Sequence, residues 1–254
     1  MPGAQGPLAS PAVDLQETLQ SQLDAWNARP LVRRLYNDWY EEIGGRLAAV
    51  PGDTVELGAG IGRLKQRFPL VVATDVEPTP WADEVIDAER LPYEDRSLAN
   101  LVLVDVFHHL GRPAAFLDET RRTLAPRGRV IVLDPYCSPV STPAYRLFHH
   151  ERTDLSASAF GAEEEVSAAP LASNQARTTL VFFREADEFR RRWPELRIVE
   201  RRRLALLLYP LSGGFSGRRL VPDAAYRPLA ALERALTSLA PLLAFRCLVV
   251  LERV

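Results

Sequence analysis

Short runs of apolar residues alternate with segments of helical spacing along the first half of the chain. Leu31, Leu35, Trp39 and Ile43 recur every four positions, as in a helix that buries one face. Further helical segments are predicted at 14–28, 64–68 and 113–124. The apolar runs predict strands at 54–57, 70–74, 85–86, 101–104 and 130–133. This alternation indicates an α/β fold in which a parallel sheet is covered on both faces.

The second half of the chain has a weaker pattern. It predicts helices at 143–151, 186–193 and 224–239, and strands at 178–183, 197–208 and 245–251. Residues 152–174 are small and polar, which is typical of a mobile loop or lid. We expect a flexible tail at 1–13 and one domain at 14–254. Its expected parts are N-terminal helices at 14–49, a ligand-binding core at 50–137, a substrate-side insertion at 138–225, and a closing helix and strand at 226–254.

Acidic residues follow several of the predicted strands. Asp75, Asp87 and Asp105 each stand where a strand ends. Ligands of open α/β sheets bind beyond the carboxyl ends of the strands, so these side chains are expected at a binding site. Helix capping or turn formation is the alternative role for any one of them.

Composition narrows the possible partners. The chain has 254 residues, 31 basic and 33 acidic, and a formal net charge of −2. No excess of positive charge points to nucleic acid. The two cysteines match no disulfide scaffold or metal-ligand spacing. No segment is apolar over the length of a membrane span or resembles a secretory signal, so we expect a cytoplasmic protein.

The basic residues are almost all arginine, because Lys65 is the only lysine. A GC-rich genome is one explanation of this bias. The other is a set of anion-binding groups, since arginine grips carboxylates and phosphates with two hydrogen bonds. The densest clusters are 190–192 and 201–203. They indicate either a solvated face or a site for an acidic substrate.

The most informative segment is a glycine-rich turn between a predicted strand and a predicted helix. It places Gly58, Gly60 and Gly62 at alternate positions, followed by Arg63. Glycines allow a sharp turn and close approach of a ligand, and the next helix offers free N–H groups. A dinucleotide-binding turn would need a glycine at position 63, so the spacing argues against that class.

The sequence E-L-G-A-G-I-G at 56–62 resembles motif I of class I S-adenosylmethionine-dependent methyltransferases. Other segments resemble that family in the same order. They are A-T-D-V-E around Asp75, D-A-E-R-L-P-Y at 87–93, S-L-A-N-L-V at 97–102, D-V-F-H-H-L at 105–110 and L-A-P-R-G-R-V at 124–130. Arg127 replaces a glycine that is usual in the last of these. The resemblance covers roughly residues 50–137 and is strongest to small, stand-alone bacterial members.

This resemblance implies a Rossmann-like, doubly wound sheet of seven mostly parallel strands, with helices on both faces and a substrate-side insertion. It implies S-adenosylmethionine as the cofactor, and the helices at 14–49 would cap it. The residues that it places at the cofactor are Glu56, Gly58, Ala59, Gly60, Gly62, Asp75, Val76, Asp87, Ala88, Asp105 and Val106.

The implied roles follow the chemistry of the cofactor. The glycine turn would pass under its methionine and ribose parts. Asp75 would accept hydrogen bonds from the two ribose hydroxyls, since a carboxylate offers paired acceptors to a diol. Val76 would pack on the adenine, while Asp87 and the Ala88 N–H would bind its polar edge. Asp105 and Val106 would lie beside the sulfonium.

Three further kinds of cofactor contact are predicted. Glu56 would orient the glycine turn or meet the ammonium of the cofactor. On the N-terminal helix, Tyr36 and Tyr40 share a face, and an aromatic ring there could lie against a cation. Arg33 on the same helix could reach a carboxylate. Packing within the helix layer is the alternative role of these residues.

The four histidines occur in two adjacent pairs. They are His108, His109, His149 and His150. Histidine is the side chain best suited to act as a base near neutral pH, so all four are candidate catalytic residues. The alternative for the first pair is packing at the strand–helix junction. Neighbouring histidines on a helix point in different directions, which argues against a two-histidine metal site at 149–150. No carboxylate–amide set of metal ligands is evident either, so we expect no metal site.

Together these features predict an enzyme, a methyltransferase that acts on a small molecule. Oxygen is the expected acceptor, and nitrogen and carbon are the alternatives. One alternative is a glycolipid or polysaccharide precursor as the substrate. The others are a nicotinamide-dependent oxidoreductase and a non-catalytic, cofactor-binding partner subunit. No Asn-Pro-Pro-Tyr-like tetrapeptide follows the fourth predicted strand, so no nucleic-acid substrate is expected.

Overall fold

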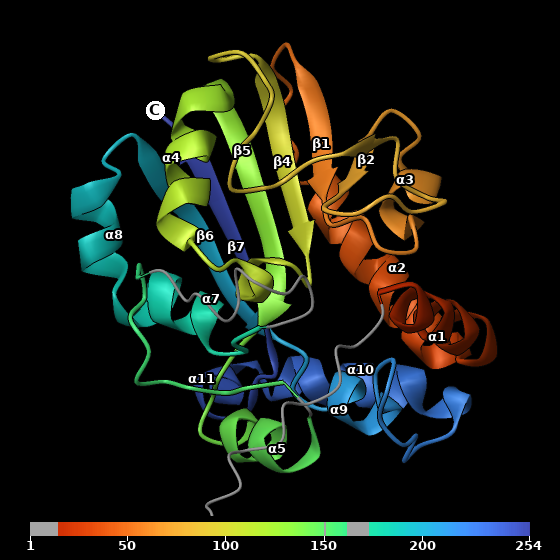
Figure 1. Ribbon diagram of the computed structural model, residues 1–254. Coiled ribbons are helices and arrows are strands. Elements are labelled where there is room, and N and C mark those ends of the chain that lie inside the picture. The colour runs from red at the N-terminus through yellow and green to blue at the C-terminus, as the bar shows by residue number, and fades with distance from the viewer. Residues whose placement is uncertain (1–14, 150, 162–172) are drawn as a thin grey trace, which may run out of the picture.

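The computed structural model describes residues 15–149, 151–161 and 173–254 (Figure 1). The predicted tail at 1–13, His150 and residues 162–172 of the predicted loop at 152–174 lie outside these ranges. Among the residues that are described, no helix is long and apolar enough to cross a membrane.

Seven strands form one sheet in the order β3-β2-β1-β4-β5-β7-β6. β1 to β5 run parallel, whereas β7 is antiparallel to both of its neighbours. This confirms the predicted Rossmann-like sheet. The strands are β1 (Asp53–Leu57), β2 (Val72–Asp75), β3 (Glu84–Val85), β4 (Leu98–Val104), β5 (Leu124–Pro135), β6 (Leu196–Leu204) and β7 (Arg246–Arg253).

Both faces of the sheet are buried, as the continuous apolar runs predict. Along β4, Leu101 and Leu103 pack on one face, while Val102 packs on the other. One face is covered by α2 (Pro30–Gly44) and α3 (Arg63–Arg67). The other is covered by α4 (Pro113–Thr123), α7 (Arg177–Thr179) and α8 (Ala186–Arg192), and Figure 1 shows the two layers on opposite sides of the strands.

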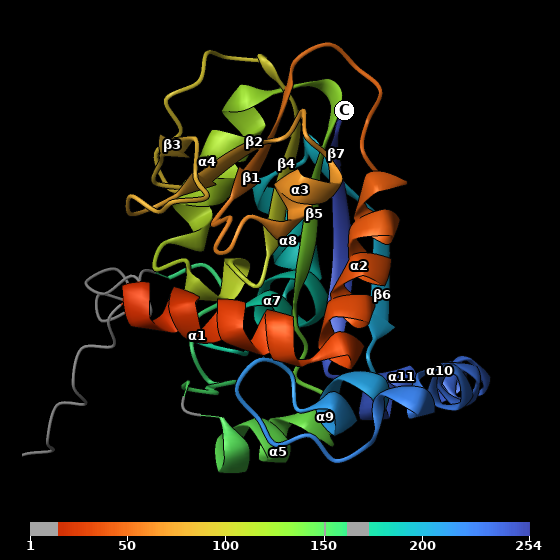
Figure 2. The same ribbon diagram turned by 90° about the vertical axis from the view of Figure 1, so that its right-hand side faces the viewer.

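A separate group of short helices lies beyond the carboxyl ends of the parallel strands (Figure 1). It consists of α5 (Ser141–Phe148), α9 (Leu208–Ser212), α10 (Tyr226–Ala235) and α11 (Ala240–Leu243). The first helix, α1 (Leu15–Ala28), crosses near the same end of the sheet (Figure 2). The N-terminal helix and segments from the second half of the chain therefore cover the carboxyl ends of the parallel strands. We call α1, α5, α9, α10 and α11 together the roof helices.

The predicted strand at 178–183 is wrong. These residues form α7 and a following π-helical turn, η2 (Leu180–Arg184). Leu180, Val181 and Phe182 are all buried against the sheet and α8, so three consecutive apolar side chains are covered. A short run that is wholly apolar fits a buried helix as well as a strand, and here tertiary packing overrides the β-propensity of threonine and valine.

Two other boundaries differ from the prediction. The strand expected at 197–208 ends at Leu204, because Ala205 adopts a left-handed φ of 62° and α9 follows. The helix expected at 224–239 is divided into η3 (Asp223–Ala225), α10 and η4 (Thr237–Leu239). Both changes shorten regular elements at the roof of the site.

Candidate functional site

The glycine-rich turn connects β1 to α3 in the conformation that its sequence requires. Gly58 and Gly62 have φ values of 69° and 65°, in the left-handed region that disfavours side chains. A Cβ atom on Gly58 would lie 2.5 Å from Cγ2 of Val106, and one on Gly62 would lie 2.8 Å from Cβ of Trp81. Gly58 thus keeps the turn against the end of β4, whereas Gly62 allows the start of α3 to lie close to Trp81.

A cavity of about 350 Å³ opens over this turn, and we call it the glycine-turn cavity. Most of the sequence-predicted cofactor residues line it. These are Tyr36, Tyr40, Glu56, Gly58, Ala59, Gly60, Asp75, Val76, Asp87, Ala88, Asp105 and Val106. Leu19 and Gln22 of α1 and His109 complete part of its wall.

Asp75 is buried at the end of β2 and braces the turn. Its Oδ2 accepts a hydrogen bond from the Gly60 N–H at 3.0 Å, and its Oδ1 accepts one from the Val76 N–H at 2.9 Å. Burial raises the pKa of this carboxyl, while backbone hydrogen bonds from Gly60, Val76 and Glu77 counteract the rise. Each oxygen has a second lone pair, so both can still accept from a diol.

Glu56 is the most unusual group in the glycine-turn cavity. It is buried on β1, and its Oε2 has no hydrogen-bond partner within the described structure. Burial, with a smaller contribution from the charge of Asp75, raises the pKa of Glu56 well above its ordinary value. A buried acceptor without a partner costs free energy, and a cationic or hydrogen-bonding ligand would remove that cost. The cavity therefore fits a ligand with an ammonium group.

The outer rim of the glycine-turn cavity suits a flat, partly apolar group. Val76 lines the cavity with 47% of its surface exposed, which a bound ring would cover. Asp87 is also exposed, and its Oδ1 accepts a hydrogen bond from the Glu89 N–H at 2.8 Å. Ala88 lines the same cavity.

Asp105 belongs to a polar network that the sequence did not predict as a whole. It follows β4 with a left-handed φ of 60°, and its Oδ2 accepts a hydrogen bond from the Tyr36 hydroxyl at 2.7 Å. Its Oδ1 pairs with the guanidinium of Arg246 on β7. Arg246 also donates to the hydroxyls of Tyr36 at 3.1 Å and Tyr209 at 3.0 Å. The sequence signal for Arg246 is a single charge within an apolar run.

Arg33 lies elsewhere. Its guanidinium donates to the backbone carbonyls of Trp26 and Asn27 at the end of α1, at 3.1 and 3.4 Å. It lines neither the glycine-turn cavity nor the neighbouring cavity described next. Arg33 therefore joins α1 to α2, and the geometry does not support its predicted contact with the cofactor.

A second cavity of about 380 Å³, which we call the histidine cavity, adjoins the first. Its walls include His108, His109, His149 and Glu151. The residues that line both cavities are Thr18, Gln22, Tyr36, Asp105, His109 and Phe215. The two cavities therefore share a wall at the end of β4.

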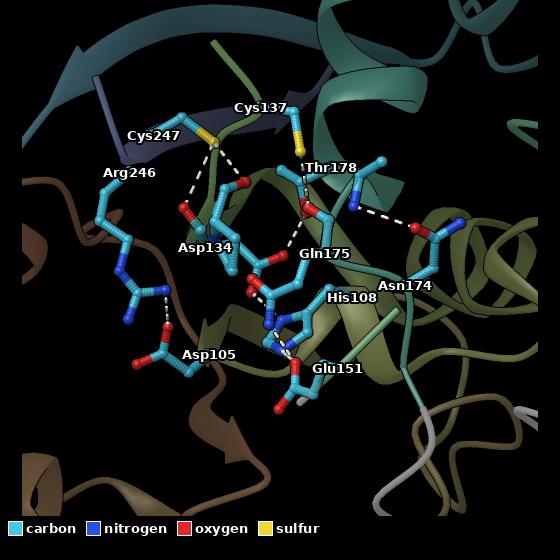
Figure 3. Close-up of polar contacts among 12 residues, drawn as sticks. Asp105, His108, Asp134, Cys137, Glu151, Asn174, Gln175, Thr178, Arg246 and Cys247 are labelled. Carbon is cyan, nitrogen blue, oxygen red and sulfur yellow. Dashed lines mark hydrogen bonds and ion pairs between the residues drawn. The ribbon is translucent and has the colours of Figure 1, made fainter. Parts of the chain in front are cut away.

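His108 is held at both ring nitrogens (Figure 3). Nδ1 lies 2.8 Å from Asp134 Oδ1, and Nε2 lies 3.3 Å from Glu151 Oε2. Burial alone lowers the pKa of this imidazole, but Asp134 and then Glu151 outweigh burial and raise it to about 10. His108 is thus a protonated cation at neutral pH. It can act as a base only after it has released this proton.

The carboxylates around His108 have their own partners. The Thr178 hydroxyl donates to Asp134, and the Gln175 amide donates to Glu151. Sequence reasoning did not assign Asp134, Glu151, Gln175 or Thr178 to the site. The sequence could have indicated Asp134, because it stands at the end of β5 as Asp75 stands at the end of β2. Glu151, Gln175 and Thr178 carried none, since they come from the irregular second half.

The other predicted histidines differ in position. The ring of His109 packs against that of His108 with centroids 4.2 Å apart, and it lines both cavities. His149 lines only the histidine cavity and makes an edge contact with Tyr145. His150 lies outside the described residues. His108, His109 and Glu151 place three potential metal-ligand atoms within 4.8 Å of one another.

The arginine clusters at 190–192 and 201–203 line neither of these two cavities. Arg190 pairs with Asp187 on α8, and Arg202 pairs with Glu42 on α2. Arg203 donates to the Tyr136 hydroxyl at 2.7 Å. Arg192 lines a separate cavity of about 560 Å³ beside α8. None of these arginines reaches the glycine-turn cavity or the histidine cavity, so those two cavities give no evidence for an acidic substrate.

Comparison with known proteins agrees with this geometry. Residues 55–132 match the family model described as a methyltransferase domain. A solved S-adenosylmethionine-dependent methyltransferase from Thermotoga maritima, described as a possible histamine N-methyltransferase, is 14% identical with a TM-score of 0.53. The match covers 94% of this chain and 99% of that one. No curated protein matches the sequence.

A second solved structure, geranyl diphosphate methyltransferase in complex with S-adenosylmethionine, is 15% identical with a TM-score of 0.50 and covers 87% of each chain. At these identities the likeness concerns the fold. Residues 55–132 therefore carry a methyltransferase domain, and the fold is shared with S-adenosylmethionine-dependent methyltransferases. The glycine-turn cavity fits S-adenosylmethionine as the cofactor.

Proposed function

We propose that this methyltransferase transfers the methyl group of S-adenosylmethionine to an oxygen atom of a small molecule bound in the histidine cavity. The observation that carries the proposal is the wall shared by the two cavities, where Tyr36, Asp105 and His109 face both. Methyl transfer requires the donor and the nucleophile in line at short range, and adjoining cavities can hold them so.

The cofactor supplies an activated methyl group, so the chain mainly has to bind and orient it. Asp75 would take the ribose hydroxyls, and Glu56 would receive the ammonium through its unpartnered oxygen. Asp105 would lie beside the sulfonium, with its charge balanced by Arg246. Val76 and Asp87 would hold the adenine at the rim.

Oxygen is the proposed acceptor because of the polar wall that faces the transfer site. A hydroxyl loses its proton as the new bond forms, so a group that assists this loss accelerates the reaction. His108, His109 and Glu151 form an imidazole–carboxylate cluster on that wall. We propose that the acceptor hydroxyl binds against the His109 side of the cluster, which borders the cofactor. A cytoplasmic location is part of this proposal, in keeping with the free thiols of Cys137 and Cys247.

The test is a substrate panel of small molecules with hydroxyl, amine or carbon nucleophiles, incubated with S-adenosylmethionine and followed by mass spectrometry. We expect methylated products from hydroxyl compounds, and much less product with a protein that carries Asp75→Ala at a cofactor concentration near the wild-type Kd. Products from amines or carbon nucleophiles alone would contradict the oxygen assignment. Methylation of glycolipid or polysaccharide precursors alone would favour that alternative substrate class. Cofactor binding without any product would favour a non-catalytic partner.

A further inference from the structure

His108, His109 and Glu151 are arranged as ligands for a metal ion. Two imidazoles and one carboxylate meet on one wall of the histidine cavity, with their ligand atoms all within 4.8 Å of one another. The Nε2 of His108 and the Oε2 of Glu151 are 3.3 Å apart. Ligand atoms about 2.1 Å from a tetrahedral ion stand roughly 3.4 Å from each other, so this pair already has suitable spacing. An ion at this point would displace the proton that His108 holds at neutral pH, because a metal-bound imidazole must be neutral.

The surroundings of the cluster orient the ligands. Asp134, which is fully buried, binds the Nδ1 side of His108 at 2.8 Å and leaves Nε2 directed toward Glu151 (Figure 3). Metal-binding histidines almost always have such a partner on the other nitrogen, because it sets the tautomer and the ring orientation. Glu151 is itself held by the side-chain amide of Gln175. Thr178 in turn donates to Asp134.

The backbone also ties the two sides of the cluster together. The Asn174 N–H donates to the carbonyl of His108 at 2.9 Å, and the Gln175 N–H donates to the carbonyl of Arg152 at 2.9 Å. The turn that carries both histidines is therefore attached to the segments that carry Glu151 and its amide partner. A set of ligands on connected backbone loses less entropy when an ion binds.

We propose that His108, His109 and Glu151 form a site for one divalent transition-metal ion of the zinc type, which holds the acceptor oxygen next to the methyl donor. Imidazole ligands favour zinc, iron, copper or nickel over magnesium, which prefers oxygen ligands. Three protein ligands leave coordination positions open to the cavity, as in catalytic metal sites. The role of the ion rests on the proposed function, whereas its binding does not.

The chemical step is balanced without a further reactant. The ion attracts the acceptor oxygen and favours loss of the hydroxyl proton to water. The oxygen electron pair forms the new bond to the methyl carbon, and the carbon–sulfur bond of the cofactor breaks. The sulfonium becomes a neutral thioether. His109 borders both cavities, so an ion at this site lies on the path between acceptor and donor.

The test measures metal binding apart from activity. The full chain is stripped with a chelator, dialysed, and titrated with Zn²⁺ and with Mg²⁺ by calorimetry, while Co²⁺ binding is followed by visible absorption. We expect one Zn²⁺ per chain, a Co²⁺ spectrum with bands in the visible range, and much weaker Mg²⁺ binding. Absence of stoichiometric Zn²⁺ and Co²⁺ binding would overturn the inference.

Variants locate the ion. His109→Ala and Glu151→Gln should each weaken Zn²⁺ binding more than Asp134→Asn. Loss of the Asp134 partner should itself cost about 10–100-fold. Glu17→Gln removes a carboxyl from the same cavity at a residue outside the cluster, and it should leave Zn²⁺ affinity unchanged. Circular-dichroism melting confirms that each variant is folded. An equal loss in this control variant would overturn the assignment of the ligands.

Activity then separates the two proposals. Methyl transfer to a hydroxyl compound that stops on chelation and returns with Zn²⁺ would support the catalytic role of the ion. Full activity in the presence of chelator would overturn that role while leaving the proposed function intact. Zinc binding at the cluster without methylation of any hydroxyl compound would contradict the proposed function but not the metal site.

Discussion

Arg246 and Asp105 form an ion pair that joins the start of β7 to the end of β4, with only 5% of the Arg246 side chain exposed. The pair lies at the wall shared by the glycine-turn and histidine cavities, and the Tyr36 hydroxyl bridges it. A charged group that far from water needs its partner, because an unpaired buried charge is strongly destabilising.

Replacement of Arg246 with methionine should therefore destabilise the protein. Breaking a buried pair costs about 3–5 kcal/mol, and we expect the lower end because Asp105 is 27% exposed. Urea denaturation measures the free energy of unfolding. The matched control is Arg202→Met, which removes a surface pair with Glu42 and should cost less than about 1 kcal/mol. Equal losses of unfolding free energy in the two variants would show that the buried Asp105–Arg246 pair stabilises the protein no more than a surface pair does.

Asp75→Ala should weaken binding of S-adenosylmethionine. The change removes charged acceptors for the ribose and the brace on the Gly60 N–H, and such hydrogen bonds contribute about 1.5–3 kcal/mol. Calorimetry would show roughly a 10- to 150-fold increase in Kd, by the ordinary relation between free energy and affinity. Asp53→Ala, at an exposed position at the start of β1, is the control. Unchanged affinity in a folded Asp75→Ala protein would remove Asp75 from the cofactor site.

Glu56→Gln should separate folding stability from cofactor binding. The neutral amide avoids the cost of a buried carboxylate, so stability should not fall. The amide cannot pair with an ammonium, so the Kd for S-adenosylmethionine should rise by about the range expected for charged hydrogen bonds. A variant that loses stability but keeps its affinity would contradict both parts of this expectation.

The pH dependence of stability provides a second test of Glu56. Burial raises its folded pKa above the ordinary value of 4.5, so the folded state holds a proton that the unfolded state has released. Stability of the wild type must then decrease as pH rises from about 4.5 toward the folded pKa. Glu56→Gln lacks this contribution. Over that pH interval the unfolding free energy of the wild type should fall relative to that of Glu56→Gln. If the two unfolding free energies change in parallel with pH, the pKa of Glu56 is not raised.

Arg127→Gly should stabilise the protein. Arg127 stands where the resembling family usually has glycine, and it adopts a left-handed φ of 63° in the irregular first part of β5. That conformation costs a side-chain-bearing residue about 1–2 kcal/mol, and the greater freedom of glycine in the unfolded state offsets part of the gain. We expect a net increase of about 0.5–1 kcal/mol in denaturant unfolding. Arg90→Gly, at an exposed position without a positive φ, should bring no gain.

The sequence alone determined the core of the fold and the cofactor half of the site. Apolar runs such as Leu101–Leu103 must be buried on both sides, and the three glycines of the turn exclude most other backbone conformations. Asp75 and Asp105 could be placed because a strand end in a parallel sheet is a fixed location. These are local properties, and each is written within a few neighbouring residues.

The tertiary structure alone decided which residues from the second half of the chain reach the site. More than 40 positions separate Arg246 from Asp105, Glu151 from His108, and Thr178 from Asp134. Gln175 lies 24 positions from its partner Glu151. Such pairs leave no periodic pattern, because their approach depends on how the roof helices pack over the sheet. The same packing turned the predicted strand at 178–183 into a helix. Local sequence patterns thus specified the glycine-turn cavity, and long-range packing specified the histidine cavity beside it.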